Sequence, residues 1–326
     1  MEAEAAAEDP VMRFLTRMTV IGLAAALAAE GAARLLIPMD ALVYRDSEDP
    51  KLAFELSPGA RGMKNGVPVE ISEQGLRDEA VPAAKAPGER RVVVVGGHEA
   101  FGVGVEAKDT FVRELADGLI DPKEGRARTI NLSMYSYHLG QKVELACQRL
   151  ASMAPELVVL QVSERDGGRP YPPSFNRPRL KNWIREHSVL ARWASEKYYL
   201  RPRRTTPGEN SDFADARAHL RRFKECADAA GARAVVMLLP DITVPAYSSP
   251  SEMRRGVEAG AKELGLPLVD AAPALEALRP EDRAVFPHER FLAPAAHRAL
   301  ADELRRRLKP LLKKRPAPAA ARRPSV

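Results

Sequence analysis

The chain contains few of the residues that build cross-linked or metal-bound folds, with two cysteines and six histidines among its 326 residues. Two cysteines exclude a disulfide scaffold and a cysteine-rich zinc module. Because Cys147 and Cys226 both lie in helix-like stretches, we expect buried free thiols rather than a bridge. Aromatic residues make up only 6%, but 45% hydrophobic and 29% charged residues are typical of a globular protein. This composition excludes a mainly disordered chain, a collagen and a multi-span transporter.

Basic charge is concentrated at the C-terminus. The net charge of +6 would favour a nucleic-acid partner if it formed a binding face. Residues 305–326 hold nine Lys or Arg and no acid, so the remainder of the chain sums to −3. Residues 313–326 are rich in proline, alanine and arginine and cannot bury a core, which predicts a basic, disordered tail. Binding of that tail to an acidic surface is the functional alternative to a merely solvated terminus, and no nucleic acid is expected as a partner.

The N-terminal region reads as a membrane segment. Residues 1–17 form an acidic tail, and residues 18–37 form an alanine-rich apolar run just long enough for a hydrocarbon core of about 30 Å. Arg13 and Arg17 on the near side favour a cytoplasmic N-terminus. Glu30 and Arg34 are four residues apart, so they can pair on one helix face near a membrane edge. The sequence therefore predicts a single-pass membrane anchor with the C-terminal domain outside the cytoplasm.

Two alternatives to an anchor remain open. The triplet at residues 26–28 fits the small-x-small cleavage site of a signal peptide, which would leave a secreted or periplasmic protein. A soluble amphipathic helix is the third interpretation. Anchor and signal peptide agree in placing the rest of the chain outside the cytoplasm.

The rest of the chain divides into an arm and a regular domain. Residues 38–88 read as an irregular arm with short strands, in which Pro68 confines the strand at 67–71 to a sheet edge. From residue 89, apolar runs alternate with helix-like stretches. The expected strands are at residues 92–95, 128–132, 157–162, 232–239 and 266–269, and the expected helices at 110–119, 138–153, 213–230, 252–264 and 294–308. We predict an α/β fold, a three-layer α/β/α sandwich on a five-stranded parallel, flavodoxin-like sheet.

Ligands of such sheets bind at the carboxyl ends of the strands. The loops of interest therefore follow the expected strands, and the third of them, residues 163–212, is long. It holds both tryptophans of the chain. This insertion is either a cap over the site or an excursion that packs its own small core, and Asp212 is the candidate N-cap of the helix after it.

Several blocks at these strand ends resemble a known family. They are residues 95–105 with 109–111, residues 131–137, residues 158–166 and residues 292–297, preceded by Gln74-Gly75-Leu76-Arg77. In this order they resemble the SGNH/GDSL hydrolases, and the last motif is similar to the lead-in of membrane-anchored bacterial members. The resemblance covers roughly residues 50–310. It implies an SGNH-like domain at 89–312 with the cap-like insertion at 163–212.

The same resemblance implies that the family's catalytic residues are replaced. Its members use the serine of a Gly-Asp-Ser motif, oxyanion donors that include a glycine and an asparagine, and an Asp-x-x-His base. Carried over by position, the nucleophile falls on His98 after Gly97, and the glycine falls on or beside Ser133. The asparagine falls on Arg165, before Asp166. The base and its orienter are reached by counting back from His297, which looks like the family's later non-catalytic histidine, and they fall on Phe291 and on His288 beside Glu289.

The expected pocket therefore contains no assigned catalytic residue, and we expect no metal and no cofactor. Phenylalanine cannot accept a proton and position 98 offers no hydroxyl, so we expect a domain without hydrolase activity that binds an acylated or anionic glycan. The alternative is a working esterase or O-acyltransferase with displaced residues: Ser133 or Ser136 as hydroxyl, His288 as base after a shift of three residues, or His98 as a nucleophile oriented by Glu289.

Other site chemistries have less support in the sequence. His98, His288, Glu289 and Asp166 lack the close ligand spacing of a zinc site. A flavin- or nucleotide-binding domain would need a glycine pattern that cradles phosphate, and none is present.

Arg165 and Glu289 are predicted to form a buried ion pair in place of the triad, walled by Phe291, His288 and His98. Adjacent residues at a strand end point in opposite directions, which favours Glu289 over Asp166 as the partner of Arg165. A separation above about 8 Å would contradict this pairing, because a direct interaction is then weak and largely screened.

Overall fold

The computed structural model describes residues 10–37, 40–164, 166, 183–184, 187–199, 211–241, 251–284 and 291–313. The chain divides into two compact units, one made of residues 1–40 and 176–205 and the other of residues 41–175 and 206–326. In its described part, the first unit contains helices α1 (Pro10–Leu36) and α6 (Val189–Tyr199). The second unit contains the sheet.

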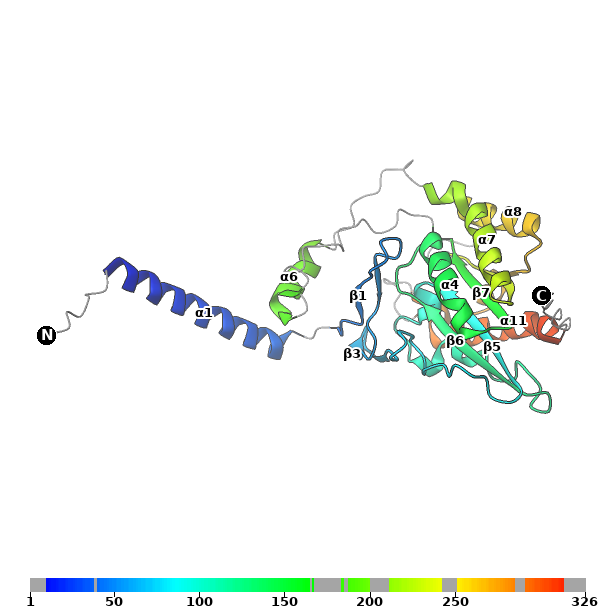
Figure 1. Cartoon of the computed structure of the whole chain (residues 1–326), viewed down its shortest axis with the longest axis horizontal. Coiled ribbons are helices and arrows are strands. Elements are labelled where there is room, and N and C mark those ends of the chain that lie inside the picture. The colour runs from blue at the N-terminus through cyan, green and yellow to red at the C-terminus, as the bar shows by residue number, and fades with distance from the viewer. Residues whose placement is uncertain are drawn as a thin grey trace, which may run out of the picture. The chain divides into compact units, whose positions relative to one another are not determined.

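The second unit is built on a five-stranded parallel sheet (Figure 1). Its strands are β5 (Glu89–Gly96), β6 (Arg126–Ser133), β7 (Leu157–Ser163), β8 (Arg233–Leu239) and β9 (Leu268–Asp270). The spatial order β6-β5-β7-β8-β9 is 2-1-3-4-5 in chain order, which is the flavodoxin-like doubly wound arrangement. The four valines at residues 92–95 of β5 are fully buried, as the β-branched run predicts for a strand covered on both faces. The predicted fold class is confirmed.

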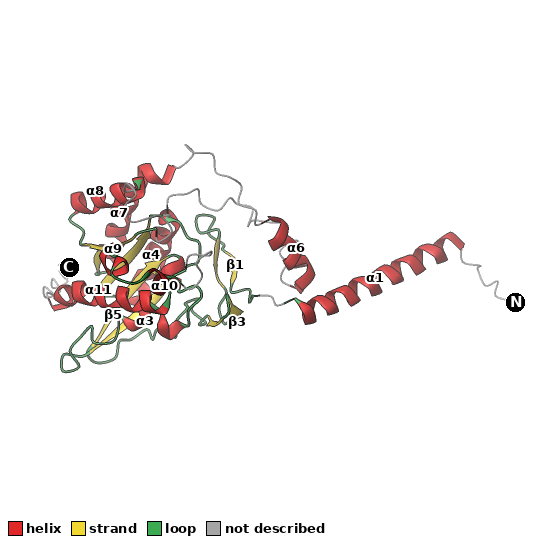
Figure 2. Ribbon diagram, turned by 180° about the vertical axis from the view of Figure 1, so that it is seen from behind, coloured by secondary structure: helices red, strands yellow, loops and turns green. Residues whose placement is uncertain are grey.

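Helices cover both faces of this sheet. One face packs on α4 (Leu139–Met153), α7 (Ser211–Ala229) and α8 (Glu252–Leu264) (Figure 1). The other packs on α3 (Phe111–Glu114), α9 (Ala272–Glu276) and α11 (Pro294–Lys313) (Figure 2). Three short helical segments lie in the connections, namely α2 (His98–Phe101), η1 (Ala107–Asp109) and α10 (Pro280–Arg283). Each face of the sheet has its own apolar core, so the domain has three layers.

Local sequence signals explain where the helices begin and end. Helix α8 begins after Ser251, whose Oγ accepts a hydrogen bond from the Arg254 N–H, and ends at Gly265 with φ of 62°. Helix α3 ends at Glu114 and is shorter than the predicted 110–119, and residues 115–119 form turns in its place. The prediction of Asp212 as an N-cap is wrong, since α7 already begins at Ser211.

Cys147 and Cys226 form a disulfide with a Cα–Cα distance of 5.0 Å, so the expectation of free thiols is wrong. The two residues lie on α4 and α7, which pack side by side on one face of the sheet. They are 79 residues apart in sequence, and only this helix packing brings them together. The bridge ties the two helices covalently.

The arm forms two antiparallel hairpins that pack on the sheet domain. Their strands are β1 (Tyr44–Asp46) with β2 (Phe54–Leu56), and β3 (Arg61–Lys64) with β4 (Val67–Glu70). Asn65 and Gly66 join β3 to β4 with φ of 49° and 79°, as a tight two-residue hairpin turn requires. Pro68 lies in β4, a strand of a two-stranded sheet, as expected for an edge position. The hairpin side chains share a core with residues that follow β5 and β6, so the arm buttresses those loops.

Helix α1 is the one helix among the described residues that is long and apolar enough to cross a membrane. It has 27 residues and begins before the predicted run at 18–37. Arg34 Nε lies 2.9 Å from Glu30 Oε1, which confirms the expected pairing. Much of the 163–212 insertion, all of 314–326 and residues 1–9 lie outside the described residues. The cap interpretation, the basic tail and the acidic tail therefore stay predictions.

Candidate functional site

The expected site lies where the carboxyl ends of β5 and β7 meet, at the point where strand order reverses. Ligands of doubly wound sheets bind at this switch point. Gly97 and His98 follow β5, and Asp166 follows β7. Ser133 ends the neighbouring strand β6, and its buried hydroxyl donates to the Val94 carbonyl oxygen at 3.4 Å.

His98 is half-buried in an aromatic setting. Its ring lies 4.3 Å from that of Tyr135 and 6.1 Å from that of Phe291, centroid to centroid, and it stacks on Phe291. The structure thus brings Phe291, on which the sequence resemblance places the base, into a stacked arrangement with His98. On another side, His98 Nε2 lies 3.2 Å from Ser136 Oγ, a hydrogen bond whose donor depends on the tautomer.

Ser136 occupies an unusual backbone conformation. Its φ is 63°, in the left-handed region that residues with a Cβ seldom adopt. Such strain persists where surrounding structure fixes it, and it is frequent at functional sites. The Ser136–His98 contact was not predicted, because the two residues are 38 apart and no motif in the sequence links them.

A buried polar network lies beneath Gly97. The ammonium of Lys142, which is fully buried, donates to the Gln161 carbonyl oxygen at 3.1 Å and to the Asp166 carboxylate. Asp166 also accepts from the Ser163 N–H at 2.8 Å. Burial raises the pKa of Asp166 to about 6, because the loss of hydration outweighs the attraction of Lys142.

Gln161 links this network to the loop after β5. Its side-chain Oε1 accepts from the Gly97 N–H at 2.7 Å, and its Nε2 donates to Glu99 Oε2 at 3.3 Å. A Cβ at position 97 would lie 3.1 Å from Lys142 Nζ and 3.2 Å from its Cε. Any side chain at position 97, including the family's aspartate, therefore requires Lys142 to move.

Arg77 of the arm fixes the same loop from outside. Its guanidinium lies 4.7 Å from the Phe101 ring centroid and donates to the carbonyl oxygens of Phe101, Gly102 and, at 2.6 Å, Val105. Burial lowers its pKa to about 10. The Gln-Gly-Leu-Arg lead-in thus has a physical role, since its arginine holds the segment that carries His98.

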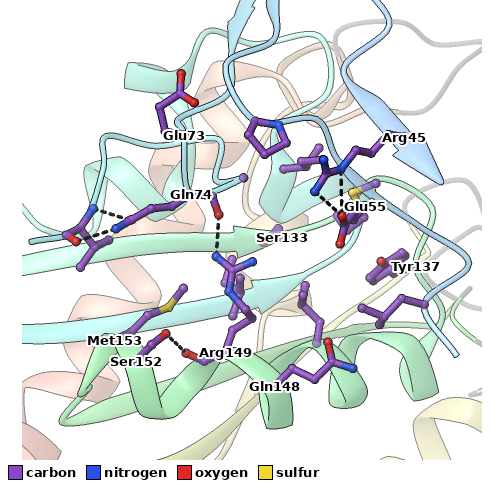
Figure 3. A pocket seen from close by; sticks show the side chains of 18 of the residues that line it. Arg45, Glu55, Glu73, Gln74, Ser133, Tyr137, Gln148, Arg149, Ser152 and Met153 are labelled. Carbon is purple, nitrogen blue, oxygen red and sulfur yellow. Dashed lines mark hydrogen bonds and ion pairs between the residues drawn. The ribbon is translucent and has the colours of Figure 1, made fainter. Parts of the chain in front are cut away.

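A cavity of about 550 Å³ opens between the arm, the end of β6 and α4 (Figure 3). Its apolar wall includes Leu132, Met134, Leu145 and Met153. Figure 3 shows the Arg149 guanidinium pointing to Gln74, whose carbonyl oxygen it reaches at 2.6 Å. Across the cavity, Arg45 and Glu55 pair at 2.7 Å. The polar lining residues are Arg45, Glu55, Glu73, Gln74, Ser133, Tyr137, Gln148, Arg149 and Ser152.

No protein-family model matches the sequence, and no curated protein matches it. Solved structures of a lipolytic protein of the G-D-S-L family from Desulfitobacterium hafniense and of a GDSL-like lipase from Bacteroides thetaiotaomicron are similar to this chain, as are those of other esterases and acylhydrolases.

The similar structures share little sequence with the chain. TesA is 18% identical with a TM-score of 0.47, over 68% of this chain and 99% of that one. The psychrotrophic esterase EstA from a Pseudoalteromonas species is 13% identical with a TM-score of 0.47, over 69% and 100%. A lipase/acylhydrolase from Enterococcus faecalis is 13% identical with a TM-score of 0.46, over 68% and 96%. At such low sequence identities and TM-scores, the similar structures do not assign an activity to this chain. Its chemistry therefore follows from its own residues.

Three of the residues expected in the SGNH-like pocket, Arg165, His288 and Glu289, lie outside the described residues, so the predicted Arg165–Glu289 ion pair stays a prediction. Within the described part of the chain, no group of three His, Cys, Asp or Glu could hold a metal ion. Lys142 and Gln161 are the site residues that the sequence-based prediction missed, and Ser136 was predicted only as a possible hydroxyl without a partner.

Proposed function

We propose that this chain is an SGNH-like, extracytoplasmic domain that has lost the family's hydrolase chemistry and binds an acylated or anionic glycan. The observation that carries the proposal is the surroundings of Gly97 and His98. His98 stands where the resemblance expects the nucleophilic serine, and Phe291, which stacks on it, stands where the resemblance expects the base. The end of the Lys142 side chain lies 3.1–3.2 Å from the place where the Cβ of an aspartate at position 97 would stand, so it would have to shift to admit one.

A cavity that, among the described residues, shares only Ser133 with the residues expected in the pocket supports a binding role. Its volume of about 550 Å³ falls within the ordinary range for small-ligand pockets, about 300–1,000 Å³. Its apolar wall suits an acyl chain. Arg149, whose pKa burial lowers, offers a half-buried cation for a carboxylate or another anionic group.

The test of lost activity uses the purified full-length protein with short acyl esters and a serine-directed fluorophosphonate. We expect no ester hydrolysis above the buffer rate and no labelled serine, because no serine stands at the family's nucleophile position. Labelling of any serine, mapped by peptide mass spectrometry, would overturn this function. The esterase EstA, whose similar structure is inhibited by monoethylphosphonate, serves as the positive control for the probe.

Ester hydrolysis by Ser136 and His98 is a second candidate, favoured by their 3.2 Å contact. In this mechanism, His98 Nε2 takes the Ser136 proton while Oγ attacks the ester carbonyl. The alcohol leaves with that proton, and water then releases the acyl group. This candidate predicts fluorophosphonate labelling that disappears in Ser136→Ala and falls in His98→Gln. Labelling that persists in Ser136→Ala would exclude it.

We also propose that α1 is an uncleaved anchor with the domain outside the cytoplasm. The exposed apolar side chains of α1 support this, as does the Cys147–Cys226 disulfide, because structural disulfides persist in oxidising compartments. A reporter fused after Val326 should be active only outside the cytoplasm, and the protein should stay in membranes after a high-salt wash. A shortened, released form that begins near Ala29 would instead identify a signal peptide.

A further inference from the structure

Helix α1 carries one carboxylate in its C-terminal third, and that carboxylate caps another helix. Glu30 Oε1 accepts from the Val189 N–H at 2.9 Å, and Oε2 accepts from Ser188 Oγ at 2.8 Å and from the Leu190 N–H at 3.2 Å. Arg34 donates to Glu30 Oε1 at 2.9 Å. The amides at the start of α6 are those that no residue of that helix can accept from, and Glu30 accepts from two of them.

A second contact reinforces this junction. Arg34 Nη2 donates to the His187 carbonyl oxygen at 2.7 Å, just before α6 begins. The Glu30–Arg34 pair therefore binds the start of α6 through both of its members. The α6 segment is defined here as residues 183–184 and 187–199. These contacts hold its start at the turn of α1 that contains Glu30 and Arg34.

The position of Glu30 on α1 corresponds to the edge of a bilayer. Glu30 lies seventeen residues after Arg13 on α1. At about 1.5 Å per residue this is about 26 Å, close to the thickness of the hydrocarbon core, and the long side chain of Arg17 can extend back to the boundary at Arg13. An ionised carboxylate is costly inside hydrocarbon, and four donors at the boundary reduce that cost. With Arg13 and Arg17 at the opposite boundary, Glu30 and the start of α6 lie at the extracytoplasmic one.

The α6 segment has the side chains that favour this depth. Both tryptophans of the chain, Trp183 and Trp193, belong to it. Trp183 is 57% exposed and stacks on His187 at 4.6 Å, and Ile184 and Leu190 are each 38% exposed. Tryptophan is enriched at membrane–water interfaces, where its ring is partly apolar and its N–H stays hydrated.

We propose that the α6 segment lies in the extracytoplasmic membrane–water interface as a second, non-spanning membrane contact, held there by Glu30. The occupant of its exposed apolar surface is the lipid headgroup region of the bilayer that α1 crosses. This inference rests on the proposed anchor. It gives residues 183–184 and 187–199 a role at the lipid surface.

Intrinsic fluorescence tests this inference directly, because the only two tryptophans of the chain lie in the α6 segment. The full-length protein is reconstituted in phosphatidylcholine vesicles whose acyl chains carry a doxyl quencher either near the headgroup or near the chain end. We expect strong quenching by the shallow label and weaker quenching by the deep one. Trp193→Phe, which leaves the exposed Trp183 as the reporter, should keep this order.

Substitution of the capping carboxylate tests how the segment is held. Glu30→Ala removes the acceptor for three α6 donors, so quenching by the shallow lipid should fall and quenching by aqueous iodide should rise. Glu70→Ala, which removes an exposed carboxylate paired with Arg61 on the β3–β4 hairpin, is the matched control and should change neither. Unchanged quenching in Glu30→Ala would contradict the role of Glu30.

The same samples separate failure of this inference from failure of the anchor. Protein that leaves the vesicles in a high-salt wash would overturn the anchor. Protein that stays with the vesicles while its tryptophans are quenched by iodide and not by either lipid label would overturn the interface contact alone.

Discussion

Asp166→Ala is expected to destabilise the fold by roughly 3–5 kcal/mol, the range for breaking a buried ion pair from one side. The substitution leaves the fully buried Lys142 ammonium without its carboxylate, beneath the loop that carries Gly97 and His98. It also removes the acceptor of the Ser163 N–H. The free energy of unfolding, measured by urea denaturation at constant disulfide state, reports the loss.

Two further variants make this result specific. Lys142→Met combined with Asp166→Asn removes both charges and keeps an acceptor for Ser163, so its loss should be clearly smaller than that of Asp166→Ala. Lys224→Met, which removes an exposed lysine paired with Asp228, should change stability by less than about 0.5 kcal/mol. The losses of unfolding free energy in the single variants Lys142→Met and Asp166→Asn should therefore not add in the double variant. A double variant whose loss equals their sum would contradict a coupled pair.

The fold was predictable because its signals are local. Apolar β-branched runs mark the strands, and α8 was predicted at about its observed bounds, where the structure shows Ser251 and Gly265 as caps. The disulfide was not predictable, because it depends on how α4 and α7 pack side by side. The docking of α6 on α1 has the same origin, since Glu30 and Ser188 are 158 residues apart.

The candidate site was predictable only in part. The family resemblance identified Gly97, His98 and Phe291, and the structure places His98 against Phe291. Ser136 was considered only as a displaced hydroxyl, because its contact with His98 depends on a left-handed backbone conformation in a loop. Periodicity alone does not reveal that conformation.

Lys142 was missed although the sequence carried a signal. It lies three residues after Leu139 and four before Ala146, on the stripe of α4 that faces the sheet. A lysine on a buried stripe needs an acid at the same level of the fold. Asp166, just past the end of β7, is that acid.

Acidification is expected to destabilise the protein by up to about 5 kcal/mol through His297. This residue is 1% exposed, stacks on Phe111 at 5.8 Å and accepts the Phe111 N–H at Nδ1 over 3.1 Å, so the fold holds it neutral. Burial, and then the charge of Arg77, lower its pKa from 6.5 to about 3. At about 1.36 kcal/mol per pKa unit, lowering the pKa from 6.5 to about 3 gives this upper bound, of which about 3 kcal/mol falls between pH 6.5 and pH 4.

The sign follows from proton binding. Between pH 6.5 and pH 3 the unfolded chain binds a proton at His297 that the folded protein does not, so the stabilisation present above pH 6.5 is lost as the pH falls. Asp166 acts in the opposite direction, because its raised pKa makes the folded protein bind the extra proton between pH 3.8 and about 6.

The comparison of wild type with His297→Gln isolates the contribution of the histidine to the pH dependence of stability, since Asp166 is common to both proteins. Glutamine keeps an acceptor for the Phe111 N–H and has no proton to gain in this range, so the variant should be less stable at pH 7 but lose less stability on acidification. Unfolding free energies measured from pH 7 to pH 4 that run parallel in the two proteins would show that His297 is not held neutral by the fold.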